Sequence, residues 1–145
     1  MVAEGISATH AQLNRNKSAL ALDLKTKDAR EIIHELVKSK HGFDIVIEGF
    51  RPGVMDKLGL GYNDLKKINN EVVYCSLTGY GQSGPLMDKA GHDINYLALS
   101  GLASYGGGGR PNLSAMQIAD IAGGSQHAVR LYGAIWGYMG WHWRV

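Results

Sequence analysis

The sequence predicts an α/β fold built around a parallel β-sheet. Three short apolar segments that are typical of strands, residues 20–24, 43–50 and 71–77, alternate with segments that have helical apolar spacing. The segment 43–50, FDIVIEGF, is a continuous apolar run, as in strands whose sheet is covered on both faces. Because strands that alternate with helices along a chain usually pair in parallel, we expect one parallel sheet.

A helix is predicted over residues 26–40, directly after the first strand. Thr26 is expected to cap its amino end, and Asp28 and Glu31 lie in its first turn, where the helix dipole favours negative charge. Five apolar residues share one face of this helix: Ala29, Ile32, Ile33, Leu36 and Val37.

Further helices are predicted after the second strand. Two short ones lie in RPGVMDKLGLG (51–61) and YNDLKKINN (62–70). Another has one apolar face, formed by Ile94, Leu97, Ala98, Gly101 and Leu102. Residues 118–140 are apolar and rich in small residues, which predicts a long packed helix. Since open parallel sheets usually have more than three strands, we interpret residues 1–145 as one incomplete domain.

The composition excludes several classes of protein. Of 145 residues, 45% are apolar and 19% charged, which argues against disorder, and no apolar run is long enough to span a membrane. The net charge of +2 comes with scattered basic residues, so neither a nucleic acid nor a membrane is an expected partner. Cys75 is the single cysteine and is interpreted as a buried small hydrophobe. No secretory signal is visible, which predicts a cytoplasmic location.

The motif GHDINYLALSG (91–101) places two titratable residues at the start of a predicted helix. In one interpretation Asp93 caps this helix and His92 makes a local hydrogen bond. Asp120 lies among apolar and small residues in QIADIAGG, where we expect a buried carboxylate that needs a partner. In the other interpretation, His92 and Asp120 face each other across a pocket and exchange protons with a substrate carbon. The remaining histidines have no metal-ligand spacing, and no metal site is predicted.

The loop TGYGQSGP (78–85) has glycines spaced as in a phosphate-binding G-x-G-x-x-G motif. Pro85 and a further polar stretch follow, so these glycines do not open a helix directly, as a dinucleotide site requires. A tight turn that shapes a pocket is the favoured interpretation.

Five segments together resemble the family III CoA-transferases and, within them, the alpha-methylacyl-CoA racemases. The segments are NRNKSALALDLK (14–25), DIVIEGFRPGVMDKLGLG (44–61), YCSLTGYGQSGP (74–85), AGHDINYLALSG (90–101) and IADIAGG (118–124). Their order and spacing carry the resemblance over about residues 14–140. It implies a Rossmann-like parallel sheet with flanking helices, in an interlocked homodimer that acts on an acyl-CoA thioester. CoA is then part of the substrate, and no other cofactor is implied.

The resemblance also implies roles for particular residues. In the racemase branch the acid–base pair falls on His92 and Asp120, whereas the transferases use the aspartate as a nucleophile and usually lack the histidine. The implied CoA contacts are Ala21, Leu22, Asp23, Leu24, Gly49, Phe50, Lys57, Gly91, Asp93, Ile94, Asn95 and Tyr96. The family's opening strand–helix–strand and its closing small domain have no counterpart in the sequence.

Three functions follow as expectations. The first is racemisation of a 2-methylacyl-CoA by 1,1-proton transfer through an enolate. The second is acyl-CoA:carboxylate CoA transfer with Asp120 as the nucleophile. The third is that the chain is an inactive fragment, or a subunit that depends on a complementing chain.

Overall fold

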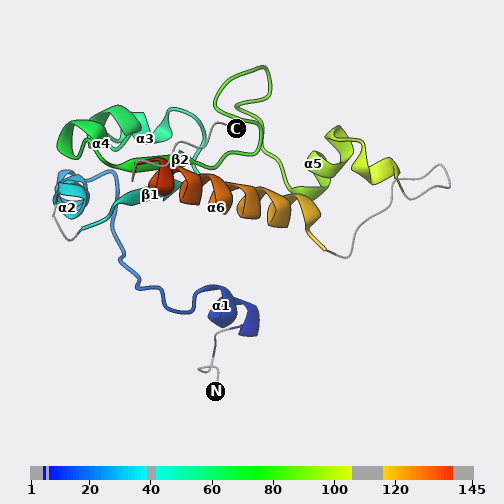
Figure 1. Ribbon diagram of the computed structural model, residues 1–145, viewed down its shortest axis with the longest axis horizontal. Coiled ribbons are helices and arrows are strands. Elements are labelled where there is room, and N and C mark those ends of the chain that lie inside the picture. The colour runs from blue at the N-terminus through cyan, green and yellow to red at the C-terminus, as the bar shows by residue number, and fades with distance from the viewer. Residues whose placement is uncertain (1–4, 6, 39–41, 106–115, 139–145) are drawn as a thin grey trace.

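The computed structural model describes residue 5 and residues 7–38, 42–105 and 116–138. Its elements, in chain order, are α1 (Ala8–Leu13), α2 (Lys27–Lys38), β1 (Ile45–Glu48), α3 (Val54–Lys57), α4 (Tyr62–Ile68), β2 (Val73–Ser76), α5 (Asp93–Leu99), a short 3₁₀ helix η1 (Leu102–Ser104) and α6 (Ile118–Tyr138) (Figure 1). The predicted α/β class and five of the predicted helices are confirmed, while the predicted end of the last helix at 140 lies outside the described residues. Helix α1 was not predicted.

The sheet consists of β1 and β2, which pair in parallel. Ile45 lies opposite Val73 and Glu48 opposite Ser76, with α3 and α4 forming the connection between the strands. The Leu77 N–H donates to the Glu48 carbonyl at 2.8 Å, which extends the pairing one residue beyond the strands. Both strands therefore end at the same edge of the sheet.

The predicted first strand, residues 20–24, is wrong. Residues 20–23 have no regular secondary structure, and the Leu20 side chain is 64% exposed. A strand requires backbone hydrogen bonds to a neighbouring strand. Within the described residues the sheet contains only β1 and β2, so this apolar segment has no partner. Leu24 nevertheless packs against the core.

The core lies between β1 and β2 on one side and α2, α3 and α4 on the other. Its fully buried members are Val37, Leu60, Leu65 and Val72. Figure 1 shows these three helices gathered at one end of the sheet, while α6 runs along the strands toward α5. Helix α6 contacts both β2 and α5. The core thus supports the strands directly and the two later helices only indirectly.

The apolar faces of the later helices are less buried than the sequence predicts. Leu97 is buried, but Ile94 and Leu102 are exposed, as is Ile121 on α6. Ile47 is also 58% exposed, so β1 is not covered on both faces. Apolar spacing identifies a face that can be buried, but the described residues do not supply enough surface to cover these faces.

None of the described helices is long and apolar enough to cross a membrane.

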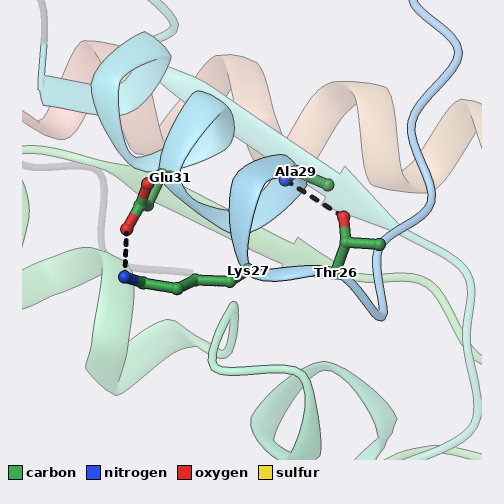
Figure 2. A network of polar contacts seen from close by, with 4 residues as sticks. All are labelled: Thr26, Lys27, Ala29 and Glu31. Atoms are coloured by element: carbon green, nitrogen blue, oxygen red, sulfur yellow. Dashed lines mark hydrogen bonds and ion pairs between the residues drawn. The ribbon is translucent and has the colours of Figure 1, made fainter.

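Thr26 caps α2 as predicted (Figure 2). Its Oγ1 accepts a hydrogen bond from the Ala29 N–H at 3.2 Å, and the same hydroxyl donates to the Asp23 carbonyl at 2.8 Å. In the first turn of α2, Lys27 Nζ lies 3.3 Å from Glu31 Oε1 in an exposed ion pair. The cap satisfies an N–H that the helix itself cannot pair.

Replacing Thr26→Ala should therefore lower the free energy of unfolding by about 1 kcal/mol, because it removes the cap. Lys27→Ala is the matched control. It breaks only a solvent-exposed ion pair and should change the free energy by less than about 0.5 kcal/mol. Urea denaturation followed by circular dichroism measures both, and equal losses would contradict the capping role.

Candidate active site

His92 is the amino-terminal cap residue of α5. Its backbone is extended, and its N–H donates to Asn95 Oδ1 at 2.9 Å. The local hydrogen bond predicted for His92 is present, but it is made by the backbone. The imidazole is exposed and lines a cavity.

This His92 cavity has a volume of about 300 Å³. It is formed by the segments that leave the two strands and by the start of α5: Gly49, Phe50, Arg51, Leu77, Thr78, Gly79, Tyr80, Met87, Lys89, Ala90, Gly91, His92 and Tyr96. Arg51 and Lys89 are the cationic members, and no carboxylate is among them. The cavity is therefore suited to an anionic ligand.

Arg51 and Lys89 were missed by the sequence analysis. Arg51 directly follows the predicted contacts Gly49 and Phe50, and Lys89 lies just before the GHDINY motif. Both positions could have been found by asking which basic residues neighbour the expected ligand contacts.

Asp120 lies in the first turn of α6 and lines a second cavity of about 500 Å³. The residues around this Asp120 cavity are Leu77, Thr78, Gly79, Tyr96, Ala119, Asp120, Gly123, Gly124 and His127. Asp120 Oδ2 accepts a hydrogen bond from Gln117 Nε2 at 3.1 Å. The expected burial of Asp120 is wrong. Although its sequence neighbours are apolar, the side chain is exposed, so it need not be paired inside a core.

Tyr96 belongs to the shared wall of the two cavities, together with residues 77–79. Its ring packs edge-on against Tyr80, with ring centroids 5.2 Å apart. Burial raises the pKa of the Tyr96 hydroxyl, and the nearby Tyr80 and Asp120 raise it further. The hydroxyl is therefore protonated at neutral pH and can donate a hydrogen bond.

Because the two cavities share Tyr96 and residues 77–79, His92 and Asp120 lie on adjoining cavities. No ion pair joins them in the described part of the chain.

Asp93 caps a helix, but not its own. Its Oδ1 accepts hydrogen bonds from the N–H groups of Ala119 at 2.7 Å and of Asp120 at 3.1 Å. Asp93 is the first residue of α5, and these two donors lie in the first turn of α6. The expectation that Asp93 caps the helix it begins is therefore wrong. Sequence spacing could not reveal an interaction between residues 26 and 27 positions apart.

The other predicted contacts divide into two groups. Gly49, Phe50, Gly91 and Tyr96 line the His92 cavity. Ala21, Leu22, Asp23, Leu24, Lys57, Asp93, Ile94 and Asn95 line neither cavity. Asp23 accepts hydrogen bonds in the turn before α2, and Lys57 is exposed at the end of α3. A role in CoA binding stays a prediction for all of these residues.

Two features argue against other chemistries. Burial raises the pKa of the Cys75 thiol, and the carboxylate of Glu48 raises it further, which disfavours the nucleophilic thiolate. Gly81 and Gly84 have φ values of 87° and 102°, and no helix follows the loop directly. The prediction of a tight turn is thereby confirmed. Among the described residues, no three His, Cys, Asp or Glu side chains gather as metal ligands do.

Two cavities lie at the carboxyl ends of the parallel strands of this α/β protein, the edge at which open α/β sheets usually bind ligands. Comparison with known families identifies it further. Residues 1–137 match the family described as CoA-transferase family III, and the chain belongs to this family.

Curated relatives include both racemases and transferases. The human protein named alpha-methylacyl-CoA racemase is 44% identical over 79% of this chain and 30% of its own length. The human succinyl-CoA:glutarate CoA-transferase is 37% identical over 89% of this chain and 28% of its own length. Among solved structures, Rv3272 from Mycobacterium tuberculosis superposes with a TM-score of 0.77 and 34% identity, covering 83% of this chain and 33% of its own. The chain thus spans about a third of the length of these relatives.

The contact between Gly79 and Tyr96 provides a test of the shared wall. A Cβ at Gly79 would overlap the Tyr96 hydroxyl, so Gly79→Ala should displace the ring and lower the free energy of unfolding by about 1–3 kcal/mol. Gly124→Ala is the control, because nothing lies within 4 Å of a Cβ there and alanine favours a helix. Urea denaturation should give opposite signs for the two variants. If Gly79→Ala leaves the free energy of unfolding unchanged, Tyr96 does not pack against Gly79, and the shared wall is contradicted.

Proposed function

We propose that the chain forms the acid–base part of a racemase that epimerises 2-methylacyl-CoA thioesters at C2. The observation that carries this proposal is the placement of His92 and Asp120 at the starts of two helices, on adjoining cavities that share Tyr96 and residues 77–79. A histidine at this motif favours the racemase over the transferase branch. The identity to relatives named alpha-methylacyl-CoA racemase supports the same choice.

The proposed reaction needs two proton carriers on opposite faces of C2. Neutral His92 takes the α-proton of one epimer, and the electron pair of the C–H bond forms the enolate of the thioester. Protonated Asp120 then delivers a proton to the opposite face of C2, which inverts the centre. The roles reverse for the other epimer, and no electrons are gained or lost overall.

The enolate oxygen requires hydrogen-bond donors. The backbone N–H groups of Asp93 and Ile94 open α5 next to His92, and neither has an acceptor among the described residues. Tyr96 contributes a protonated hydroxyl to the wall between the cavities. Tyr96 lines both cavities, whereas Asp93 and Ile94 adjoin His92 without lining either, so Tyr96 is the favoured donor to the oxygen of a thioester that spans both cavities.

The anionic part of CoA is proposed to bind at the His92 cavity. Arg51 and Lys89 supply two positive charges there, and Gly49 and Phe50 supply the adjoining backbone. Lys57, the phosphate contact implied by the family resemblance, lies outside this cavity. Arg51 and Lys89 are therefore the favoured phosphate contacts.

CoA transfer is the second candidate. Its supporting observation is that the Asp120 carboxylate is exposed to the larger cavity, where a nucleophile can reach a thioester carbon. The carboxylate would attack that carbon, the C–S bond would break, and CoA thiolate would leave an acyl–aspartyl anhydride. Relatives named as CoA-transferases make this the alternative to test.

We also propose that the chain works in a homodimer or with a complementing chain. The support for this proposal is the apolar surface that the described residues leave exposed. Ile118, Ile121, Val129 and Tyr132 are exposed along α6. Such a surface favours association with another chain. The alternative to this proposal is that the chain is an inactive fragment.

Coenzyme A affinity tests the proposed anion site. Arg51→Gln and Lys89→Gln should each weaken binding by about threefold, because each removes an exposed charge near the phosphates. Lys57→Gln should leave affinity unchanged. Isothermal titration of the chain with CoA measures all three. Loss of affinity only in Lys57→Gln would replace the proposed contacts by the one that the family resemblance implies.

Racemisation is tested in a chimaera that carries residues 14–137 in place of the matching third of a complete family member. In heavy water a single epimer should lose its α-hydrogen, gain deuterium and racemise. His92→Gln and Asp120→Asn should each slow racemisation by about 10³-fold, since each removes one proton carrier, while CoA affinity changes little.

The same chimaera separates the two reactions. If hydroxylamine in the presence of acyl-CoA modifies Asp120 and no deuterium enters C2, the protein is a transferase and the racemase proposal is wrong. A matched incubation with Asp120→Asn controls for reaction at other carboxylates.

A further inference from the structure

Asp93 connects the two residues proposed to carry protons. It is covalently joined to His92, and its Oδ1 accepts a hydrogen bond from the backbone N–H of Asp120 itself. A second hydrogen bond, from Ala119 to the same oxygen, is 2.7 Å long. One peptide bond and one hydrogen bond therefore link residues that are 28 positions apart.

We infer that Asp93 is a positioning residue, which sets where the Asp120 carboxylate lies relative to the His92 imidazole. The inference rests on the proposed function for the roles of His92 and Asp120. Asp93 is half-buried, so water competes weakly for its hydrogen bonds. The first N–H groups of a helix have no partner within the helix, and a carboxylate is a favourable acceptor for them.

Helices α5 and α6 also pack against each other. Asp120 Oδ2 is bonded to Gln117, which belongs to the same segment and cannot fix its distance from His92. Leu97 is the buried residue of α5, one turn beyond Asp93. Among the described residues, the polar contacts between the starts of the two helices are the two hydrogen bonds to Asp93. Proton transfer depends on distances fixed to a fraction of an ångström, so this anchor bears directly on rate.

The position of the acceptor can be separated from the charge by two conservative variants. Asp93→Asn keeps an acceptor oxygen at the same place and removes the charge. Asp93→Glu keeps the charge and moves the acceptor by one methylene. If Asp93 positions α6, Asp93→Asn should restore the amide protection and the proton-exchange rate that Asp93→Ala loses, and Asp93→Glu should not. If its charge instead acts on His92, glutamate should rescue and asparagine should not.

The first measurement is made on the chain itself and does not depend on catalysis. Amide hydrogen exchange by NMR should be about tenfold faster at Ala119 and Asp120 in Asp93→Ala and Asp93→Glu, and within about threefold of the original chain in Asp93→Asn. Asp64→Glu, the same change on α4, should leave both amides unaltered. Unchanged exchange in Asp93→Ala would overturn the inference. If Asp93→Ala does not fold, amide exchange in Asp93→Asn is compared with that in Asp93→Glu, and equal rates in these two variants overturn the inference.

The second measurement uses the racemase chimaera. Asp93→Ala and Asp93→Glu should lower kcat for α-proton exchange by about 100-fold with little change in KM, and Asp93→Asn should recover at least tenfold of the alanine loss. Equal losses in all three variants would overturn the positioning role. If the unaltered chimaera exchanges no deuterium, the proposed function fails, while the amide result still decides whether Asp93 anchors α6.

Discussion

The parallel pairing of β1 and β2 is the constraint on which the site depends. It brings Glu48 and Ser76 to the same edge of the sheet, and the Leu77 N–H continues the pairing to the Glu48 carbonyl. The Glu48 carboxylate then accepts the Phe50 N–H at 2.8 Å, which fixes the turn after β1. Residues 49–51 and 77–79 consequently leave the sheet side by side. Both segments line the His92 cavity, and residues 77–79 also line the Asp120 cavity.

The absence of two side chains lets Tyr96 lie between the cavities. A Cβ at Gly79 would overlap the Tyr96 hydroxyl, and one at Gly91 would lie 2.7 Å from the ring. Both glycines have ordinary negative φ values, so space and not backbone conformation explains them. Tyr80 packs edge-on against the same ring. The glycines therefore shape the wall that separates the His92 side from the Asp120 side.

Sequence reasoning succeeded where the signal is local. The Thr26 cap and the tight turn at Gly81 and Gly84 depend on residues close in sequence. It failed where a distant segment decides the outcome. Apolar neighbours suggested that Asp120 is buried, yet its side chain is exposed to a cavity, and Asp93 was assigned to the wrong helix because its partners lie 26 and 27 residues away. Family resemblance predicts that His92 and Asp120 act as a pair, which spacing alone left open.

The two halves of the site are held by different forces. Strands β1 and β2 pack through Val46 and Tyr74 on a buried cluster that includes Leu60 and Leu65, so burial of apolar surface stabilises the strands from which the turns emerge. The half that carries His92 and Asp120 has one buried residue on α5. It is attached through the contacts of α6 with β2 and α5, the packing of Tyr96 on Tyr80, and the hydrogen bonds to Asp93. A carboxylate that accepts two N–H groups defines direction and distance more narrowly than an apolar contact does. Polar anchoring is thus well suited to a site whose proposed chemistry depends on where two proton carriers lie.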